Sequence, residues 1–458
     1  MISEVRKLLD EKKYASLRDL LCAEEPADIA QLFEQFPKEE VPLMFRILHK
    51  DFATEVFVEM DTELQQALIE AFTDKELYEI IDDLFMDDTV DIIEEMPANV
   101  VKRILSHTAP EKREKINQLL HYPEDSAGTI MTTEFVELKV DMSAADAFAV
   151  IRNTGLEKET VYTCYVTDSK RVLIGVVTVK DMIMGGDSTK IGDLMIEDPI
   201  SVHTDDDKED VMKAMTRYDF LAMPVVDKEG RLVGIVTIDD AMDVMQDEDT
   251  EDIEKMAAIV PSDKPYFKTG VFETWRSRIP WLMLLMVSAT FTSRILTHFE
   301  DALAGLPILV AFVPQLTDTG GNAGSQASVS VIRGLSLGEI RLRDALRVLW
   351  KELRVSLLCG LTLGIVNFGK MMLLNDVSRS RYGAGQAMLI SGVVCLTIAL
   401  AVVVAKIVGS MLPLLAKRVG LDPAVMASPF ITTIVDIITL LLYFGLAVAI
   451  LSFAGIQI

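Results

Sequence analysis

The sequence contains few of the residues from which enzyme active sites are usually built. Its 458 residues include five histidines, which form no HExxH motif or other catalytic constellation, and no P-loop lysine motif is present. The four cysteines are widely scattered, so there is neither a disulfide framework nor a CxxC zinc motif. These absences argue against an enzyme and predict no catalytic residues.

The sequence also lacks a secretory signal, and its first half lacks a basic surface. The N-terminal segment MISEVRKLLDEKKY has no apolar core of the kind found in signal peptides. Residues 1–270 carry 60 Asp and Glu against 29 Lys and Arg, whereas residues 271–458 carry 10 against 15. Nucleic-acid binding requires basic patches, so no nucleic-acid partner is expected. We expect the acidic half in the cytoplasm, where its charge suits a protein that handles cations.

Long hydrophobic runs, by contrast, dominate the second half. About 20 apolar residues suffice to cross a bilayer as a helix. Lys and Arg concentrate in the loops after the second and fourth runs, and such loops remain cytoplasmic. We therefore expect a multi-pass protein in the bilayer of the cell membrane, with a cytoplasmic N-terminus and an extracytoplasmic C-terminus. The five predicted spans are residues 279–296, 302–331, 357–374, 387–415 and 424–453.

The last run contains a single charged residue, Asp436. An acid at the centre of a membrane helix costs at least about 3 kcal/mol. Helical spacing puts Ser428, Thr432 and Asp436 in one row, with Pro429 beside it, so a polar stripe crosses an apolar helix. One interpretation is that a neighbouring helix supplies a polar partner for this acid. The functional interpretation, which intramembrane acids favour, is a cation site.

The second run contains a glycine-rich stretch, Gly320-Gly-Asn-Ala-Gly-Ser-Gln326. Such a stretch is expected to form a poor regular helix, and lipid does not tolerate unsatisfied backbone groups. It must therefore face protein or water. Two interpretations remain open: small residues that permit close helix packing, or oxygens that face a water-filled path.

An internal duplication occupies the middle of the chain. A Gly-containing strand pattern around Gly175 recurs around Gly234, 59 residues later. The two copies resemble a pair of cystathionine-β-synthase (CBS) motifs, which are α+β modules. The Thr-x-x-Asp positions of the two copies match those at which such modules hold an adenosine ribose, although the same residues also serve as helix caps. The resemblance therefore makes ATP a candidate ligand of Thr178, Asp181, Thr237 and Asp240.

Short apolar-periodic segments separated by cap and turn clusters precede this duplication, and they predict stacked helices. Acidic residues become dense from Asp205 onward but form no EF-hand loop. Carboxylates on separate surfaces can share Mg²⁺ or Ca²⁺, and they repel one another without it. The predicted architecture is multidomain: an α-solenoid at 1–125, a tandem α+β CBS pair at 126–249, a connecting helix at 250–270 and an all-α transmembrane domain of five helices at 271–458.

The glycine-rich stretch, together with Leu421-Asp-Pro-Ala424 and Ser428-Pro-Phe-Ile-Thr-Thr433 before Asp436, resembles the signature of the MgtE family of magnesium channels. The order of domains is similar as well. The resemblance implies a homodimer that conducts Mg²⁺ through a pore on its twofold axis and is closed by cytosolic Mg²⁺. It implies a pore lined by the second and fifth spans, which include Gly320, Gly321, Asn322, Gly324, Gln326, Ser428 and Pro429.

The resemblance also implies roles for individual acids. Asp436 matches the pore aspartate, and Thr432 occupies a position whose backbone helps to form that site. The sequence departs from the family pattern at two positions that bear on local packing and conductance, Lys406 in the fourth span and Thr439 after the pore acid. The positions that match regulatory Mg²⁺ sites are Glu55, Asp87, Asp88, Asp91, Asp207, Glu209, Asp219, Asp240, Asp243, Glu248, Glu251 and Asp252.

Two other functions stay open at this point. The first is transport of another divalent cation, Mn²⁺ or Co²⁺. The second is a membrane-anchored CBS sensor that transports nothing, which leaves the intramembrane acid unexplained. One carboxylate per subunit is too few to strip the water from Mg²⁺, but it suits an ion held through its hydration shell.

Overall fold

The computed structural model describes residues 1–262, 264, 266–300, 304, 306–377, 382–426 and 428–454. The chain divides into two compact units, residues 1–245 and 246–458, which are considered separately.

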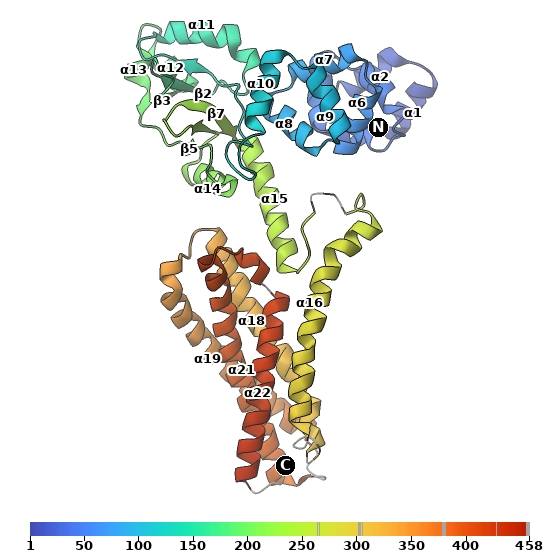
Figure 1. The fold of residues 1–458 in the computed structure, drawn as a ribbon, viewed down its shortest axis with the longest axis vertical. Helices are drawn as coiled ribbons and strands as arrows, with labels where there is room; N and C mark the ends of the chain where they lie inside the picture. Colours follow the sequence, from blue (N-terminus) through green and yellow to red (C-terminus); the bar gives the residue numbers. More distant parts are fainter. Residues whose placement is uncertain are drawn as a thin grey trace. The chain divides into compact units, whose positions relative to one another are not determined.

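The first unit begins with an array of ten short helices (Figure 1). Cap chemistry sets their boundaries: Asp61 accepts a hydrogen bond from the Leu64 amide, and Thr73 with Glu76 forms a capping box. The prediction of a helical N-terminal domain is confirmed. The helices are α1 (Ile2–Asp10), α2 (Tyr14–Leu21), α3 (Pro26–Phe33), α4 (Val41–Arg46), α5 (Lys50–Val58), α6 (Thr62–Ala71), α7 (Asp74–Asp83), α8 (Met86–Glu95), α9 (Ala98–His107) and α10 (Pro110–Leu119).

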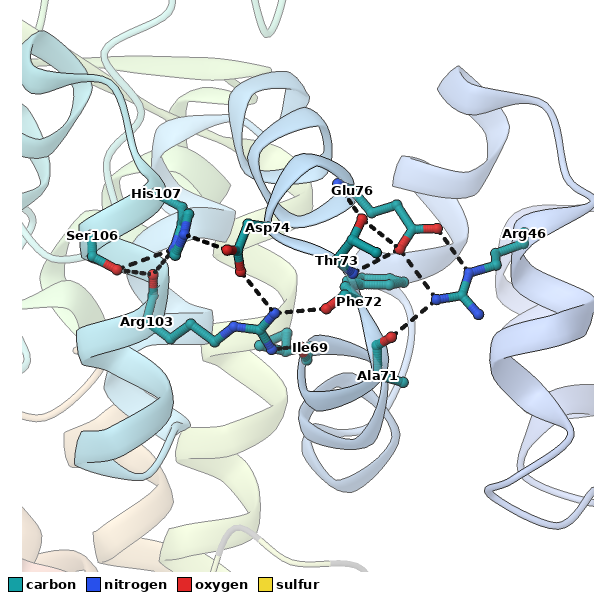
Figure 2. Close-up of polar contacts among 10 residues, drawn as sticks. All are labelled: Arg46, Ile69, Ala71, Phe72, Thr73, Asp74, Glu76, Arg103, Ser106 and His107. Carbon is teal, nitrogen blue, oxygen red and sulfur yellow. Dashed lines mark hydrogen bonds and ion pairs between the residues drawn. The ribbon is translucent and has the colours of Figure 1, made fainter.

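Two arginines hold neighbouring helices of this array together (Figure 2). Arg46 donates to both carboxylate oxygens of Glu76, at 2.8 and 3.2 Å, and to the Ala71 carbonyl at 3.0 Å. Arg103 of α9 donates to the carbonyls of Ile69 and Phe72. Carbonyls at the C-terminal end of a helix have no intrahelical partner. The arginines therefore satisfy the end of α6 and fix the helices on either side of it.

The rest of the first unit is the duplicated α+β part, as predicted. Its two sheets have the strand orders β1-β2-β3-β4 and β5-β6-β7. Gly175 pairs with Val166 in one sheet, and Gly234 pairs with Val225 at the equivalent position of the other. The elements are β1 (Glu137–Leu138), α11 (Ala144–Thr154), η1 (Gly155–Glu157), β2 (Thr163–Thr167), β3 (Leu173–Thr178), α12 (Val179–Gly185), α13 (Ile191–Leu194), β4 (Ile196–Glu197), β5 (Val202–His203), α14 (Lys208–Tyr218), β6 (Ala222–Val226) and β7 (Leu232–Thr237).

The second unit is a helical bundle, in which α21 packs against α18, α19 and α22 (Figure 1). The helix α15 (Ile238–Met256) begins in the first unit and ends in the second. The remaining elements are α16 (Val271–His298), η2 (Pro307–Phe312), α18 (Val313–Ser336), η3 (Leu342–Asp344), α19 (Ala345–Leu374), α21 (Ala384–Arg418), η4 (Pro423–Met426) and α22 (Ser428–Phe453).

Four helical segments of the described chain are long and apolar enough to cross a membrane: Val271–His298, Leu342–Leu374, Ala384–Arg418 and Pro423–Phe453. The predicted span at 302–331 is not among them. Residues 302, 303 and 305 lie outside the described part, and most of the remainder forms the more polar helix α18. The expectation of a poor helix at 320–326 is wrong, because α18 continues through this stretch.

Candidate functional site

The glycines of α18 allow close contact with α22 and α21. A Cβ added at Gly320 would lie 2.9 Å from Thr439 Oγ1, and one at Gly324 would lie 2.9 Å from Ile431 Cγ2 and 3.2 Å from the Ala405 carbonyl oxygen. A Cβ at Gly321 would overlap the methyl group of Thr432. These distances fit close helix packing, one of the two interpretations left open. The packing of these glycines against α21 and α22 offsets the roughly 1 kcal/mol that each glycine costs in a helix.

Asp436 is half-buried on α22, one turn after Thr432. Its Oδ1 atom is buried and has no hydrogen-bond partner within the described part of the chain. Thr432 lies against Gly321 of α18, while the Pro429 carbonyl accepts a hydrogen bond of 3.1 Å from the Thr433 hydroxyl. The side chain of Ser428 lies outside the described residues. A buried acceptor without a partner costs about 1–3 kcal/mol, and more when charged, so this oxygen is suited to a cation or its water.

A polar row occupies the exposed face of α18. Asp318, Asn322, Gln326 and Ser330 follow one another at intervals of four residues, and all four are exposed in the single chain. Asn322 and Gln326 therefore do not share the buried face of the glycines. The charge of Asp318 acts on Asp436. Asp318 was absent from the predicted site, although its spacing from Asn322 and Gln326 was visible in the sequence.

The second acidic site lies in the first unit, where α8 meets the start of α15 and the segment after η1. Asp87 is 6% exposed, and its Oδ1 atom has no hydrogen-bond partner among the described residues; the same holds for Glu159 Oε2. Asp88 follows Asp87 on α8, and Asp240 lies in the first turn of α15. Glu159 was not predicted, because no local motif marks it.

The pKa values of this group reflect burial and mutual repulsion. Burial, followed by the charge of Asp240, raises the pKa of Asp88 to about 7 and that of Glu159 to about 8. The same two causes hold the pKa of Asp87 well above its ordinary value. Burial raises the pKa of Asp240 to about 6, against the hydrogen bond from Thr237. We call Asp87, Asp88, Glu159 and Asp240 the acidic junction.

The other acids predicted in the first unit have diverse surroundings. Asp91 is exposed, and it interacts electrostatically with Asp240 and Asp88 of the acidic junction. Asp243 is also exposed, and it interacts electrostatically with Asp239. Glu55 is exposed on α5. Across the described residues, no group of three or more His, Cys, Asp or Glu side chains is arranged to hold a metal ion. In α14, Asp207 caps the N-terminus, Glu209 pairs with Lys213 at 2.7 Å, and Asp219 ends the helix with a left-handed backbone.

The end of α15 belongs to the second unit and forms polar pairs within that unit. Lys255 lies 2.5 Å from Glu251 and 2.7 Å from Asp422. Burial would lower the pKa of Lys255, but its hydrogen bonds to Asp422 and Glu251 outweigh burial and raise it. Ser336, the last residue of α18, donates to Asp252 at 3.4 Å. Glu251 and Asp252, which were predicted as Mg²⁺ ligands, thus have partners within the chain, and Glu248 lies one turn before Asp252 on the same helix.

The Thr-x-x-Asp pairs have the hydrogen bonds of helix caps. The Thr178 hydroxyl donates to Asp181 at 2.5 Å at the start of α12, and the Thr237 hydroxyl donates to Asp240 at 2.5 Å before α15. Lys406, at which the sequence departs from the family pattern, has a partner. Its ammonium lies 3.9 Å from the Glu352 carboxylate of α19, and both side chains are largely buried.

Three families match successive parts of the chain. Residues 24–125 match the MgtE intracellular N domain, residues 127–185 and 191–247 match CBS domains, and residues 313–446 match MgtE, described as a divalent cation transporter. These matches confirm the predicted order of a helical N domain, a CBS pair and a membrane region. They describe a multi-pass membrane protein with an intracellular N domain.

Full-length relatives agree with these matches. The chain is 36% identical to "Magnesium transporter MgtE" of Thermus thermophilus over 97% of both chains. It is 31% identical to the protein of the same name from Bacillus subtilis, over 98% of this chain and 97% of the relative. A solved structure entitled "Crystal structure of the cytosolic domain of the Mg2+ channel MgtE in complex with ATP" is 33% identical, with a TM-score of 0.51, and covers 53% of this chain and 100% of its own. These relatives are transporters and not enzymes, and the chain belongs to the MgtE family of magnesium transporters.

Proposed function

We propose that this protein is a Mg²⁺ channel in which Asp436 binds the hydrated ion. The observation that carries the proposal is the buried Asp436 Oδ1 atom, which has no partner among the described residues, on a membrane helix beside the polar row of α18. Mg²⁺ gives up its water reluctantly, so one carboxylate per subunit holds the ion through its water shell. Inward flow of Mg²⁺ needs no coupled energy source, because an inside-negative potential of 100 mV contributes about 4.6 kcal/mol for a divalent ion.

We propose that the pore forms between two copies of the chain. Asp318, Asn322 and Gln326 are exposed on a helix that lies among membrane-spanning segments. Polar groups are costly against lipid, so this row needs water or a second copy to cover it. A twofold axis beside α18 and α22 places a second copy and a water-filled path against this row. It also brings the Asp436 carboxylates of the two copies to one path. In this arrangement α18 also crosses the membrane, which brings the number of spans to five, and the C-terminus is extracytoplasmic.

Cytosolic Mg²⁺ closes this channel through the acidic junction. Asp87, Asp88, Glu159 and Asp240 come from three elements, and their raised pKa values reflect first the cost of burying their charges and then their mutual repulsion. A divalent ion that binds only the assembled junction shifts the equilibrium toward the closed state, and its removal releases the repulsion. Asp91 and Asp243, which interact electrostatically with Asp240, and the exposed Glu55 of α5 are further proposed ligands. Asp207, Glu209 and Asp219 are the proposed ligands on the second CBS motif.

The end of α15 is the part that transmits this closure. Lys255 links it to Asp422, which also accepts a hydrogen bond of 2.8 Å from the Ala424 amide just before α22. Asp252 links it to the end of α18. One helix end therefore contacts the end of α18, which carries the polar row, and the segment that precedes α22, which carries Asp436. Glu248 and Glu251 are the proposed Mg²⁺ ligands beside these links.

The test is Mg²⁺ uptake by liposomes that contain the Asp436→Ala variant. We expect uptake to fall to background, because the ion loses its binding group, while the variant still reaches the membrane. Glu300→Ala, which removes an exposed acid just beyond α16, is the matched control and should transport normally. Normal uptake by Asp436→Ala would contradict the pore. Competition by Mn²⁺ or Co²⁺ in the same assay ranks the alternative ions.

A second proposed ligand is ATP, bound by the CBS pair. A relative's cytosolic domain was solved in complex with ATP, and Thr178 with Asp181 and Thr237 with Asp240 form the hydroxyl–carboxylate pairs expected at a ribose. Titration calorimetry with ATP should show binding to the full chain and weaker binding to Asp181→Asn. Equal binding by the two proteins would remove Asp181 from the site.

A further inference from the structure

The register of α18 against α22 determines where Asp318 lies relative to Asp436. Gly324 contacts Ile431, Gly321 contacts Thr432, and Gly320 contacts Val435 and Thr439, so the two helices run in opposite directions. Asp318 precedes Gly320 by two residues. It therefore lies beyond the level of Gly320, toward the C-terminal end of α22 and away from the Lys255–Asp422 link.

Asp318 also lies on the edge of α18 that faces the Asp436 row. Residues three apart are neighbours on a helix surface, so Asp318 adjoins Gly321, and Gly321 contacts Thr432, one turn before Asp436. The charge of Asp318 acts on Asp436 across this edge. Within the described residues, the exposed Asp318 carboxylate takes part in no hydrogen bond or ion pair.

An uncompensated acid on the surface of a membrane unit is costly unless water or a cation reaches it. Structural explanations are weak for Asp318, because it caps no helix and pairs with no basic group of the described chain. Its row-mates Asn322 and Gln326 are likewise exposed. An acid in such a row is suited to meet a hydrated cation before it reaches Asp436.

We propose that Asp318 is a second cation-binding carboxylate of the ion path, placed ahead of Asp436 for an ion that enters from the C-terminal end of α22. This inference rests on the proposed channel function and deepens it. Two adjacent sites favour conduction, because an ion arriving at the first repels the ion held at the second. The first site also concentrates divalent cations at the entrance, since a carboxylate attracts a double charge twice as strongly as a single one.

The experiment is Mg²⁺ uptake by liposomes as a function of external Mg²⁺, with the Asp318→Asn variant of the full chain. We expect the external Mg²⁺ concentration for half-maximal uptake to rise by about fivefold. This is the effect of removing the Coulomb attraction between a divalent ion and one carboxylate several ångströms away in a water-filled path. The maximal rate should stay within about twofold, because Asp436 still holds the ion. Asp318→Glu should restore the wild-type concentration.

Glu339→Gln is the matched control, because it removes an exposed acid from the loop that follows the same helix. An unchanged half-maximal concentration in Asp318→Asn would overturn the inference, and so would an equal shift in Glu339→Gln. A fall in the maximal rate alone, without rescue by Asp318→Glu, would mean a packing role and would also overturn it. Failure of the channel function itself is distinguishable, because the wild-type protein would then show no uptake.

Discussion

The acidic side chains at the two ends of α15 have opposite surroundings. At the first end, Asp240 faces Asp87, Asp88 and Glu159, and buried oxygens of Asp87 and Glu159 have no partner among the described residues. At the last end, Glu251 and Asp422 share the ammonium of Lys255. Buried carboxylate oxygens at the first end therefore lack a partner among the described residues, whereas a lysine of the chain pairs with the acids at the last end.

We infer from this difference that the first end of α15 is part of an ion sensor and that its last end is a mechanical link. The carboxylates of the acidic junction repel one another, and the charge of Lys112 offsets only part of this repulsion at Asp88. We therefore infer that the junction assembles most readily when a cation or protons neutralise it. The pairs of Lys255 with Glu251 and Asp422 need no external cation to form. We infer that α15 responds at its first end and stays attached to the membrane unit at its last.

The largest effect is expected from neutralising the first end. The triple variant Asp87→Asn, Asp88→Asn, Asp240→Asn removes the carboxylates that a divalent ion would bridge. We expect Mg²⁺ uptake by this variant to continue at millimolar internal Mg²⁺, at which we expect the wild-type protein to be closed. Liposome uptake against internal Mg²⁺ measures this. A triple control, Glu111→Gln, Glu114→Gln, Glu124→Gln, removes the same charge from exposed positions nearby and should keep wild-type inhibition. Full inhibition of the junction variant would contradict the sensor.

A smaller effect is expected from breaking the last end. Lys255→Met leaves Glu251 and Asp422 without their common partner. These groups are partly exposed, so the loss of stability should be about 1 kcal/mol or less. The half-inhibiting internal Mg²⁺ should rise by about fivefold, the lower range of coupling between sites. Lys75→Met, which breaks an exposed pair with Glu79, is the control. Hydrogen exchange at the Ala424 amide should also speed up in Lys255→Met, and unchanged exchange would contradict the link.

The most gradual effect is expected from pH. Asp88, Glu159 and Asp240 have folded-state pKa values of about 7, 8 and 6, above those of the unfolded chain. The folded state therefore binds more protons, and stability without Mg²⁺ is full near pH 4 and is lost as pH rises through 6 to 8. The melting temperature of the first unit in chelator should fall over this range, by about 2–4 °C for each kcal/mol lost. Stabilisation by added Mg²⁺ should grow with pH. A chelated melting temperature that rises with pH would contradict this.

Local chemistry made much of the fold predictable. Cap residues such as Thr73 and Asp61 marked the helix array, and the spacing of Gly175 and Gly234 revealed the duplication. Asp436 stood out because an acid in an apolar helix is expensive. In each case the signal lay within a few residues of the feature that it predicted.

The features that were missed depend on partners far away in the chain. The continuity of α18 depends on Ile431, Thr432 and Thr439, which fill the space above its glycines, and nothing near Gly320 identifies them. Lys255 finds Asp422 across 167 residues. Glu159 joins the acidic junction only because the fold brings η1 close to α8. Such contacts are properties of the assembled core and not of any local pattern.

The measurement that tests the account most directly is Mg²⁺ uptake by liposomes containing the wild-type chain, at micromolar and at millimolar internal Mg²⁺. The account predicts rapid uptake at micromolar internal Mg²⁺ and little at millimolar, with the driving force matched between the two conditions. Equal uptake in the two conditions would contradict the gate, and no uptake in either would contradict the channel.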